Sequence, residues 1–475
     1  MIKRNVIYNF IYQIFIYIVP LITTPYLTRI LGASSIGEFS FAYSVATYFA
    51  LFSVLGLTNY GNREISRVSH LDCDRRDTFW EIYSTQIVTG IVSLIVYLLY
   101  AFVLTEPTLM KSVMVLYVIS FILDISWFYF GMELFKVIIT RNVILKITSC
   151  LFIFIFVKGK SDAWIYGLII SVSTLLSQII LWVNISKYVG SPKVSVYGIK
   201  ARLLPNAKLF IPVIAVSIYK IMDKIMLGIY SNNEQVGFYE SSERLISIPV
   251  CFVTALGTVM LPRISNMLSR GDQQKNIKML TEKSLVISVL SSSLISFGMI
   301  GVLDEFIPFF FGQGYEPCKN ILMILLPSTI FVAQANVIRT QVLIPYQKDN
   351  VYIISVILGA LVNLISNLIF IPRFGAVGAA FGTLLSEGTV CIFQNFFAAK
   401  YLNVFRVFVT IIPIVLLGYL MMQFIDRIYL NIYSTIIVIV IKAIIGFVIF
   451  ALASSVYLFS VKYVLGFLKH RRKNT

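Results

Sequence analysis

The chain has 475 residues, of which 58% are hydrophobic and 13% are charged, and its mean hydropathy is +0.86. A soluble domain is about half apolar and a quarter charged, so this composition excludes a soluble protein and indicates a membrane protein with many spans. The net charge of +17 does not indicate a nucleic-acid partner. Most basic residues fall in loops on one side of the predicted topology, as the positive-inside rule requires of the cytoplasmic side.

Apolar runs of about 18 or more residues predict about fourteen transmembrane helices, so the expected fold class is an all-α polytopic membrane protein. Both termini are then cytoplasmic, and no loop is long enough to form a soluble domain. In chain order, the predicted spans are 6–29, 36–58, 80–104, 110–132, 138–157, 163–185, 207–229, 237–260, 284–304, 319–343, 351–371, 376–399, 407–425 and 433–460.

Two of these spans contain six charged residues, which form the first candidate site. Each set of three is spaced i, i+3, i+4 and therefore shares one face of its helix. A charge at the bilayer centre costs roughly 2.5–3.5 kcal/mol on insertion scales, so we interpret the six as a seam that faces a polar cavity. The alternative is that they form structural ion pairs which lock two helices together. The residues are Lys220, Asp223 and Lys224 in the seventh span and Glu240, Glu243 and Arg244 in the eighth.

The chain repeats itself at an offset of about 200 residues, since segment 31–41 resembles 227–241 and segment 55–66 resembles 256–265. An even number of spans separates the copies, which predicts a parallel repeat about an axis normal to the membrane and two lobes around a central cavity. The expected domains are an N-terminal six-helix lobe (1–185), a cytoplasmic linker (186–206), a C-terminal six-helix lobe (207–400), and two extra helices with a basic cytoplasmic tail (401–475).

Residue types for enzyme chemistry are scarce. Five scattered cysteines and two histidines indicate neither a disulfide framework nor a metal site nor a histidine-based triad. A polyprenyl-dependent glycosyltransferase or polymerase usually carries a large outer loop, whereas the outer loop 304–319 is short. We therefore expect no enzyme activity and no cofactor. The chain also lacks the phosphate loop of an ATPase, so its energy is expected from a H⁺ or Na⁺ gradient or from downstream use of a product.

Four segments carry a resemblance to a known family: 55–67 (LGLTNYGNREISR), 124–133 (DISWFYFGME), 259–265 (VMLPRIS) and 371–380 (IPRFGAVGAA). Together they resemble the polysaccharide-transporter branch of the multidrug/oligosaccharidyl-lipid/polysaccharide exporter superfamily, in particular its Wzx-type O-antigen or capsule repeat-unit flippases. The resemblance covers about residues 1–400. It implies a V-shaped pair of six-helix lobes that moves an undecaprenyl-pyrophosphate-linked repeat unit from the cytoplasmic to the outer leaflet by alternating access.

The implied substrate requires a polar path across the bilayer for its pyrophosphate and sugars. Arg and Lys suit phosphate, and amide side chains suit sugar hydroxyls. Alternatives remain open for three of the charged candidates, since Arg63 and Arg263 could anchor helix ends and Asp124 could pair with Arg141 or Lys146. The candidate cations are Lys220, Lys224, Arg244, Arg339, Arg29, Arg63 and Arg263; the acids that could hold them or couple an ion are Asp223, Glu240, Glu243 and Asp124; the candidate sugar contacts are Asn9, Gln13 and Asn336.

The resemblance also implies a location and partners. The expected location is the bacterial cytoplasmic (inner) membrane, and the expected partners are the lipid-linked glycan, membrane lipids, a polysaccharide polymerase and a chain-length regulator. Two other transport functions stay open. One is a multidrug or metabolite antiporter of the same superfamily, and the other is a flippase for a peptidoglycan lipid precursor, which also carries a pyrophosphate.

Overall fold

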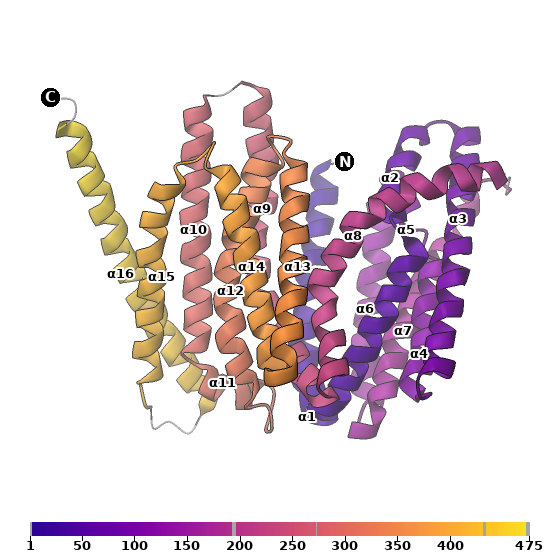
Figure 1. Cartoon of the computed structure of the whole chain (residues 1–475), viewed down its shortest axis with the longest axis horizontal. Helices are drawn as coiled ribbons and strands as arrows, with labels where there is room; N and C mark the ends of the chain where they lie inside the picture. Colours follow the sequence, from indigo (N-terminus) through magenta and orange to yellow (C-terminus); the bar gives the residue numbers. More distant parts are fainter. Residues whose placement is uncertain (1, 192–195, 272, 431–433, 472–475) are drawn as a thin grey trace. The chain divides into compact units, whose positions relative to one another are not determined.

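Helices make up most of the part that the computed structural model describes, which comprises residues 2–191, 196–271, 273–430 and 434–471 (Figure 1). No strand occurs within these residues. The helices are α1 (Ile2–Val54), α2 (Leu57–Val68), α3 (Asp72–Leu99), α4 (Leu109–Ile122), α5 (Ser126–Gly131), α6 (Phe135–Phe156), α7 (Ala163–Val183), α8 (Val196–Tyr230), α9 (Asn233–Ser269), α10 (Gln274–Ile300), α11 (Leu303–Phe310), α12 (Cys318–Ile338), α13 (Asp349–Phe374), α14 (Ala376–Ala398), α15 (Val404–Asp426) and α16 (Thr435–Arg471).

Within the described residues, 12 helices are long and apolar enough to cross a membrane. The predicted all-α polytopic fold is therefore confirmed, and the chain is a multi-pass membrane protein. Most predicted spans fall on a single helix: the first two lie mainly in α1, and the seventh lies in α8. The span 110–132 is instead divided between α4 and α5, and the second span runs past the end of α1 into α2. The count of fourteen itself stays a prediction. The first two spans correspond to two arms of α1, 2–31 and 33–54. Gly32, with a φ of 74°, forms the kink between them.

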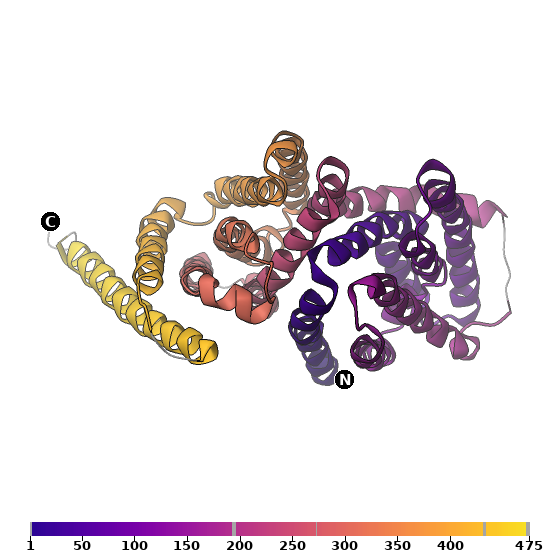
Figure 2. The same cartoon turned by 90° about the horizontal axis from the view of Figure 1, so that it is seen from below.

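The chain forms two compact units, Met1–Glu240 and Ser241–Thr475. Within each unit most helices run roughly side by side, as the end-on view of Figure 2 shows. The first unit includes α8, which contacts α1, α2 and α3. The predicted lobes of 1–185 and 207–400, the linker and the terminal helix pair stay predictions, as does the arrangement of the lobes around a cavity.

The start of α8 is fixed within the first unit by an arginine. The guanidinium of Arg202 donates to a carboxylate oxygen of Glu81 on α3 at 2.9 and 3.0 Å, and it lies 3.4 Å from the hydroxyl of Tyr60 on α2. A planar guanidinium can donate to one oxygen through two N–H groups at once, which a Lys ammonium cannot do with this geometry. The second half of the predicted linker, as far as it is described, is therefore a helix that crosses α2 and α3.

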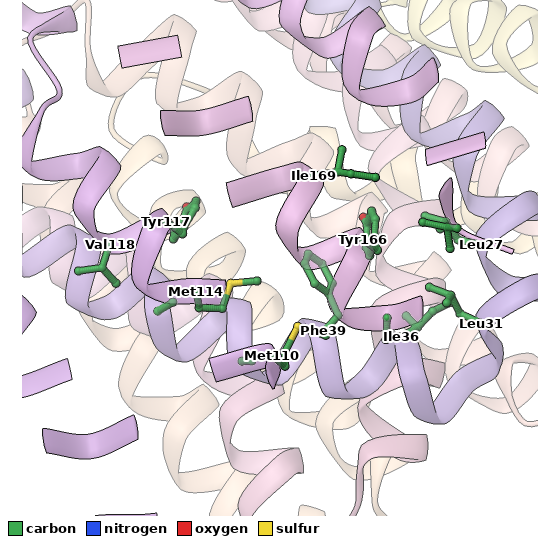
Figure 3. Packing of buried hydrophobic residues seen from close by; sticks show 14 of the residues in the cluster. Leu27, Leu31, Ile36, Phe39, Met110, Met114, Tyr117, Val118, Tyr166 and Ile169 are labelled. Atoms are coloured by element: carbon green, nitrogen blue, oxygen red, sulfur yellow. The ribbon is translucent and has the colours of Figure 1, made fainter. Parts of the chain in front are cut away.

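The second arm of α1 packs with α4 and α7 in the apolar core of the first unit (Figure 3). The rings of Phe39 and Tyr166 have centroids 4.3 Å apart, and the rings of Tyr43 and Tyr117 have centroids 4.8 Å apart. Large aromatic side chains bury much apolar surface in few residues. Because this face of α1 is packed in the core, another face, which carries Ser40, is directed toward α8 and α9. The residues labelled in the figure are Leu27, Leu31, Ile36, Phe39, Met110, Met114, Tyr117, Val118, Tyr166 and Ile169.

The second unit relies on small polar residues and on one buried ion pair. Ser296 of α10 donates to the carbonyl of Leu326 on α12 at 2.9 Å, and small residues of this kind let membrane helices approach closely. Lys442, inside the last predicted span, pairs with Glu305 of α11 and is only 5% exposed. The pair compensates a charge that would otherwise be costly in the membrane.

Candidate functional site: an intramembrane charged cluster

The two copies of the repeat meet where Gly37 faces Gly237. A Cβ built on Gly37 would lie 1.6 Å from the carbonyl oxygen of Asn233, and a Cβ on Gly237 would lie 1.9 Å from the carbonyl oxygen of Ala33. The contact is reciprocal, because Ala33 and Asn233 are related by the same offset as the two glycines. A contact between equivalent patches has this property. Only glycine allows the second arm of α1 and the start of α9 to approach this closely.

Glu240 lies one turn beyond this crossing, and one of its oxygens, Oε2, accepts two hydrogen bonds. Ser40 of α1 donates at 2.9 Å, and the ammonium of Lys224 on α8 donates at 3.0 Å. The side chains of Lys224 and Glu240 are only 16% and 12% exposed. The carboxylate therefore joins three helices of the first unit, and Lys224 is largely neutralised by it.

Asp223 is the second acid of the cluster and is 3% exposed. The Tyr239 hydroxyl donates to its Oδ2 at 2.5 Å, a short distance typical of a bond to a charged acceptor. Asp223 and Lys224 are consecutive on α8, as Tyr239 and Glu240 are on α9. The two bonds therefore form adjacent rungs between these helices. We define the charged cluster as Ser40, Asp223, Lys224, Tyr239 and Glu240.

The other three residues of the predicted seam are not among these five. Lys220 is exposed, while Glu243 and Arg244 are half-buried and belong to the second unit. Arg244 lies near the hydroxyl of Tyr315, in the loop before α12; burial raises the pKa of Tyr315, and the charge of Arg244 acts in the opposite direction. The structure thus brings together Asp223, Lys224 and Glu240 out of the six.

The other predicted cations lie near helix ends or aromatic rings. Arg63, at 50% exposure, pairs with Glu64 at 3.1 Å, and its guanidinium lies over the Tyr60 ring. Arg263 and Arg29 are exposed. Arg339 begins the π-helical segment Arg339–Leu343 after α12, and its guanidinium lies 5.6 Å from the centre of the Tyr352 ring. Their roles in substrate binding stay predictions.

The predicted sugar contacts and the remaining predicted acid, Asp124, lie outside the charged cluster as defined. Asn336 on α12 is 6% exposed, and its Oδ1 has no hydrogen-bond partner among the described residues and faces Gly257 of α9. Asp124 accepts a hydrogen bond from the backbone N–H of Ser126 at 2.8 Å, at the start of α5. The side chains of Asn9 and Gln13 lie outside the described part of the structure.

Residues 2–268 match the family described as polysaccharide biosynthesis proteins. The match covers more than half of the chain. The chain belongs to this family. All residues of the charged cluster fall inside the matched region of this polysaccharide biosynthesis family member.

Named relatives agree with this membership, and a solved structure shares the fold. The chain is 25% identical over 392 residues to the "Putative O-antigen transporter" of Escherichia coli K12, which covers 81% of this chain and 94% of the relative. It is 27% identical over 186 residues to the "Probable low-salt glycan biosynthesis flippase Agl15" of Haloferax volcanii, 39% of each chain. The fold is similar to the lipid II flippase MurJ in an inward closed conformation, with a TM-score of 0.76, 16% identity and coverage of 97% and 99%.

The sequence did not indicate two residues of the charged cluster, Ser40 and Tyr239. Both are uncharged, so neither has the high free-energy cost of membrane insertion that marks a charged residue in a span. The offset of the repeat could have found Ser40, since it aligns Ser40 with Glu240. No comparable signal marks Tyr239. Within the described residues, no group of three His, Cys, Asp or Glu side chains could hold a metal ion.

Proposed function

We propose that this chain is a flippase that moves undecaprenyl-pyrophosphate-linked oligosaccharide repeat units of an O-antigen or capsule across the cytoplasmic membrane. The observation that carries the proposal is the similarity to the O-antigen transporter of Escherichia coli, because it extends over 81% of this chain and 94% of the relative. Family membership and the glycan flippase relative support the same class of substrate. No catalytic step is part of the proposal.

The charged cluster supplies a means of receiving an anion inside the membrane. Lys224 is held by Glu240 at 3.0 Å, so a pyrophosphate would have to displace the carboxylate to reach the ammonium. Such an exchange keeps the cation compensated both with and without substrate, which limits the cost of its burial. Asp223, held by Tyr239, would take up H⁺ or Na⁺ if transport is coupled to an ion gradient.

A flippase for a peptidoglycan lipid precursor is the second candidate, because the fold resembles the lipid II flippase over nearly the whole of both chains. At 16% identity this likeness concerns the fold alone. Both candidate substrates carry a pyrophosphate on a polyprenyl chain, so the charged cluster suits either. The glycan relatives favour the first candidate, and partners for it would be a polymerase and a chain-length regulator.

Deleting the gene in its native cell is expected to remove the surface glycan and to cause the undecaprenyl-pyrophosphate-linked repeat unit to accumulate inside. The physical reason is that the sugars and the pyrophosphate cannot cross the apolar bilayer unaided. Immunoblots of surface glycan and mass spectrometry of extracted lipids measure the two effects. An unchanged surface glycan in the deletion strain would contradict the proposal. Rescue of a strain depleted of its lipid II flippase would favour the second candidate.

The proposed topology places both termini in the cytoplasm, and single-cysteine labelling tests it. Cysteines introduced at Arg67 and Lys278 are expected to be protected from a membrane-impermeant maleimide in intact cells, and cysteines at Glu106 and Asn232 to be labelled. Labelling requires a background without the five native cysteines, of which Cys73 is exposed. The opposite labelling pattern would overturn both the topology and the parallel orientation of the repeat.

A further inference from the structure

Lys146 is a cation at the middle of a membrane-spanning helix. It is the twelfth of the 22 residues of α6. At about 1.5 Å per residue, it lies about 16 Å from either end of the helix. The four-carbon stem of a lysine is far too short to carry the ammonium to the headgroups over such a distance. The charge of Lys146 must therefore be compensated inside the membrane.

Lys146 also stands on the side of α6 that faces the protein. Ile144 and Ile155 are exposed at 57% and mark the outward side of the helix. Lys146, which is half-buried, lies about 180° around the helix from Ile155 and about 160° from Ile144. The contacts of α6 in the first unit are with α1, α5 and α7. Lipid tails are thus on the opposite side from this ammonium.

Three other intramembrane cations have partners among the described residues. Lys224 pairs with Glu240, Lys442 pairs with Glu305, and Arg141 donates to the carbonyl of Ser177 at 2.8 Å. No side chain that the structure describes forms a hydrogen bond or an ion pair with Lys146. An uncompensated charge at this depth marks a functional site by default.

Polar groups continue above and below Lys146 along the contact between α6 and α7. Asn142, one turn below, accepts from the Arg141 guanidinium at 2.8 Å, and Ser149, about one turn above, donates to the Ser173 hydroxyl of α7 at 2.7 Å. Residues three and four apart share a helix face, so these side chains form a polar strip along the middle two turns of α6. Lys146 is the unpaired charge in the middle of it.

We propose that Lys146 binds a phosphate group of the lipid-linked substrate as it passes the middle of the membrane. This anion site lies in the first unit on α6, apart from the charged cluster on α8 and α9, and it rests on the proposed function. A lysine ammonium binds phosphate as a point charge, without the fixed geometry that Arg imposes. The ligand chemistry is a phosphate ester on a lipid, which polyprenyl pyrophosphates and phospholipids share.

The experiment measures binding of undecaprenyl pyrophosphate to the full-length protein in nanodiscs, by native mass spectrometry. Lys146→Gln is expected to weaken binding by about tenfold or more, as for loss of a hydrogen bond to a charged group. Lys146→Arg keeps the charge and should retain binding. Lys158→Gln is the matched control, since it removes the same charge just beyond the end of α6, where the side chain is exposed. Binding of Lys146→Gln equal to that of the unaltered protein would overturn the proposal.

Thermal unfolding separates binding from a structural role. Removal of an uncompensated charge should leave the melting temperature of Lys146→Gln unchanged or higher, whereas loss of a structural contact would lower it and contradict the proposal. Phosphatidylglycerol is added as a competitor. Equal competition that disappears in Lys146→Gln would assign the site to bulk lipid and overturn the assignment to substrate. Failure of the unaltered protein to bind undecaprenyl pyrophosphate would contradict the proposed function itself, and with it this inference.

Discussion

Replacing Gly37 or Gly237 by alanine is expected to abolish glycan export and to lower the amount of folded protein in the membrane. The added Cβ would lie 1.6 Å from the carbonyl oxygen of Asn233 in the first case and 1.9 Å from that of Ala33 in the second. Backbone atoms cannot rotate away as a flexible side chain would. Overpacking usually costs 1–3 kcal/mol, and we expect roughly the upper end of this range or more. Surface glycan and the melting temperature of the purified variants measure the effects.

Gly388→Ala is the matched control for these variants. Gly388 is also a buried glycine within a helix of the membrane, but a Cβ there would come no closer than 3.8 Å, to the Phe331 ring. Alanine also has a higher helix propensity than glycine, so this variant should export normally. Normal export by Gly37→Ala and Gly237→Ala would show that α1 and α9 do not cross at these glycines.

Removing either partner of the Lys224–Glu240 pair is expected to abolish export and to destabilise the protein. Lys224→Met leaves the Glu240 carboxylate without this cation, and Glu240→Gln leaves the ammonium without this anion, both at low exposure. Breaking a buried pair by removing one partner costs about 3–5 kcal/mol. The melting temperature should therefore fall in both single variants, and surface glycan should be lost.

The double variant Lys224→Met/Glu240→Met separates a structural role from a functional one. Replacing both charges by apolar residues of similar size is often neutral for stability, so the folded protein should return. Export should not return, because the ammonium that receives the anion is absent. Lys442→Met/Glu305→Met is the matched control, since it removes another buried pair to which no substrate role is assigned. It should restore both stability and export relative to its single variants.

The sequence predicts the fold class well because its signals are local. Long apolar runs require helices in a membrane, and most predicted spans fall on a single helix, although 110–132 is divided between α4 and α5. From the sequence alone, a kink at Gly32 within one helix could not be distinguished from a loop between two helices, since a glycine suits either structure. The repeat predicted equivalent residues but not that Gly37 and Gly237 would touch, because contact depends on how two helices cross.

The candidate site could be predicted only in part. Helical spacing put Lys220, Asp223 and Lys224 on one face, yet the structure leaves Lys220 exposed and brings its two neighbours to α9. The face of a helix is local, whereas the depth and the rotation of that face against its neighbours depend on the packed unit. Lys146 illustrates the same limit. A pairing of Asp124 with Arg141 or Lys146 is one reading of the sequence, and the structure shows Asp124 accepting a hydrogen bond from the backbone N–H of Ser126 at 2.8 Å.

The most direct test of the account is transbilayer movement of an undecaprenyl-pyrophosphate-linked oligosaccharide in liposomes that contain the purified protein. A glycan-binding lectin added outside reports the fraction of substrate that becomes accessible with time. We expect movement with the unaltered protein and none above empty liposomes with the folded Lys224→Met/Glu240→Met variant. Equal rates of movement for these two proteins would contradict the role of the charged cluster, and no movement with either would contradict the proposed function.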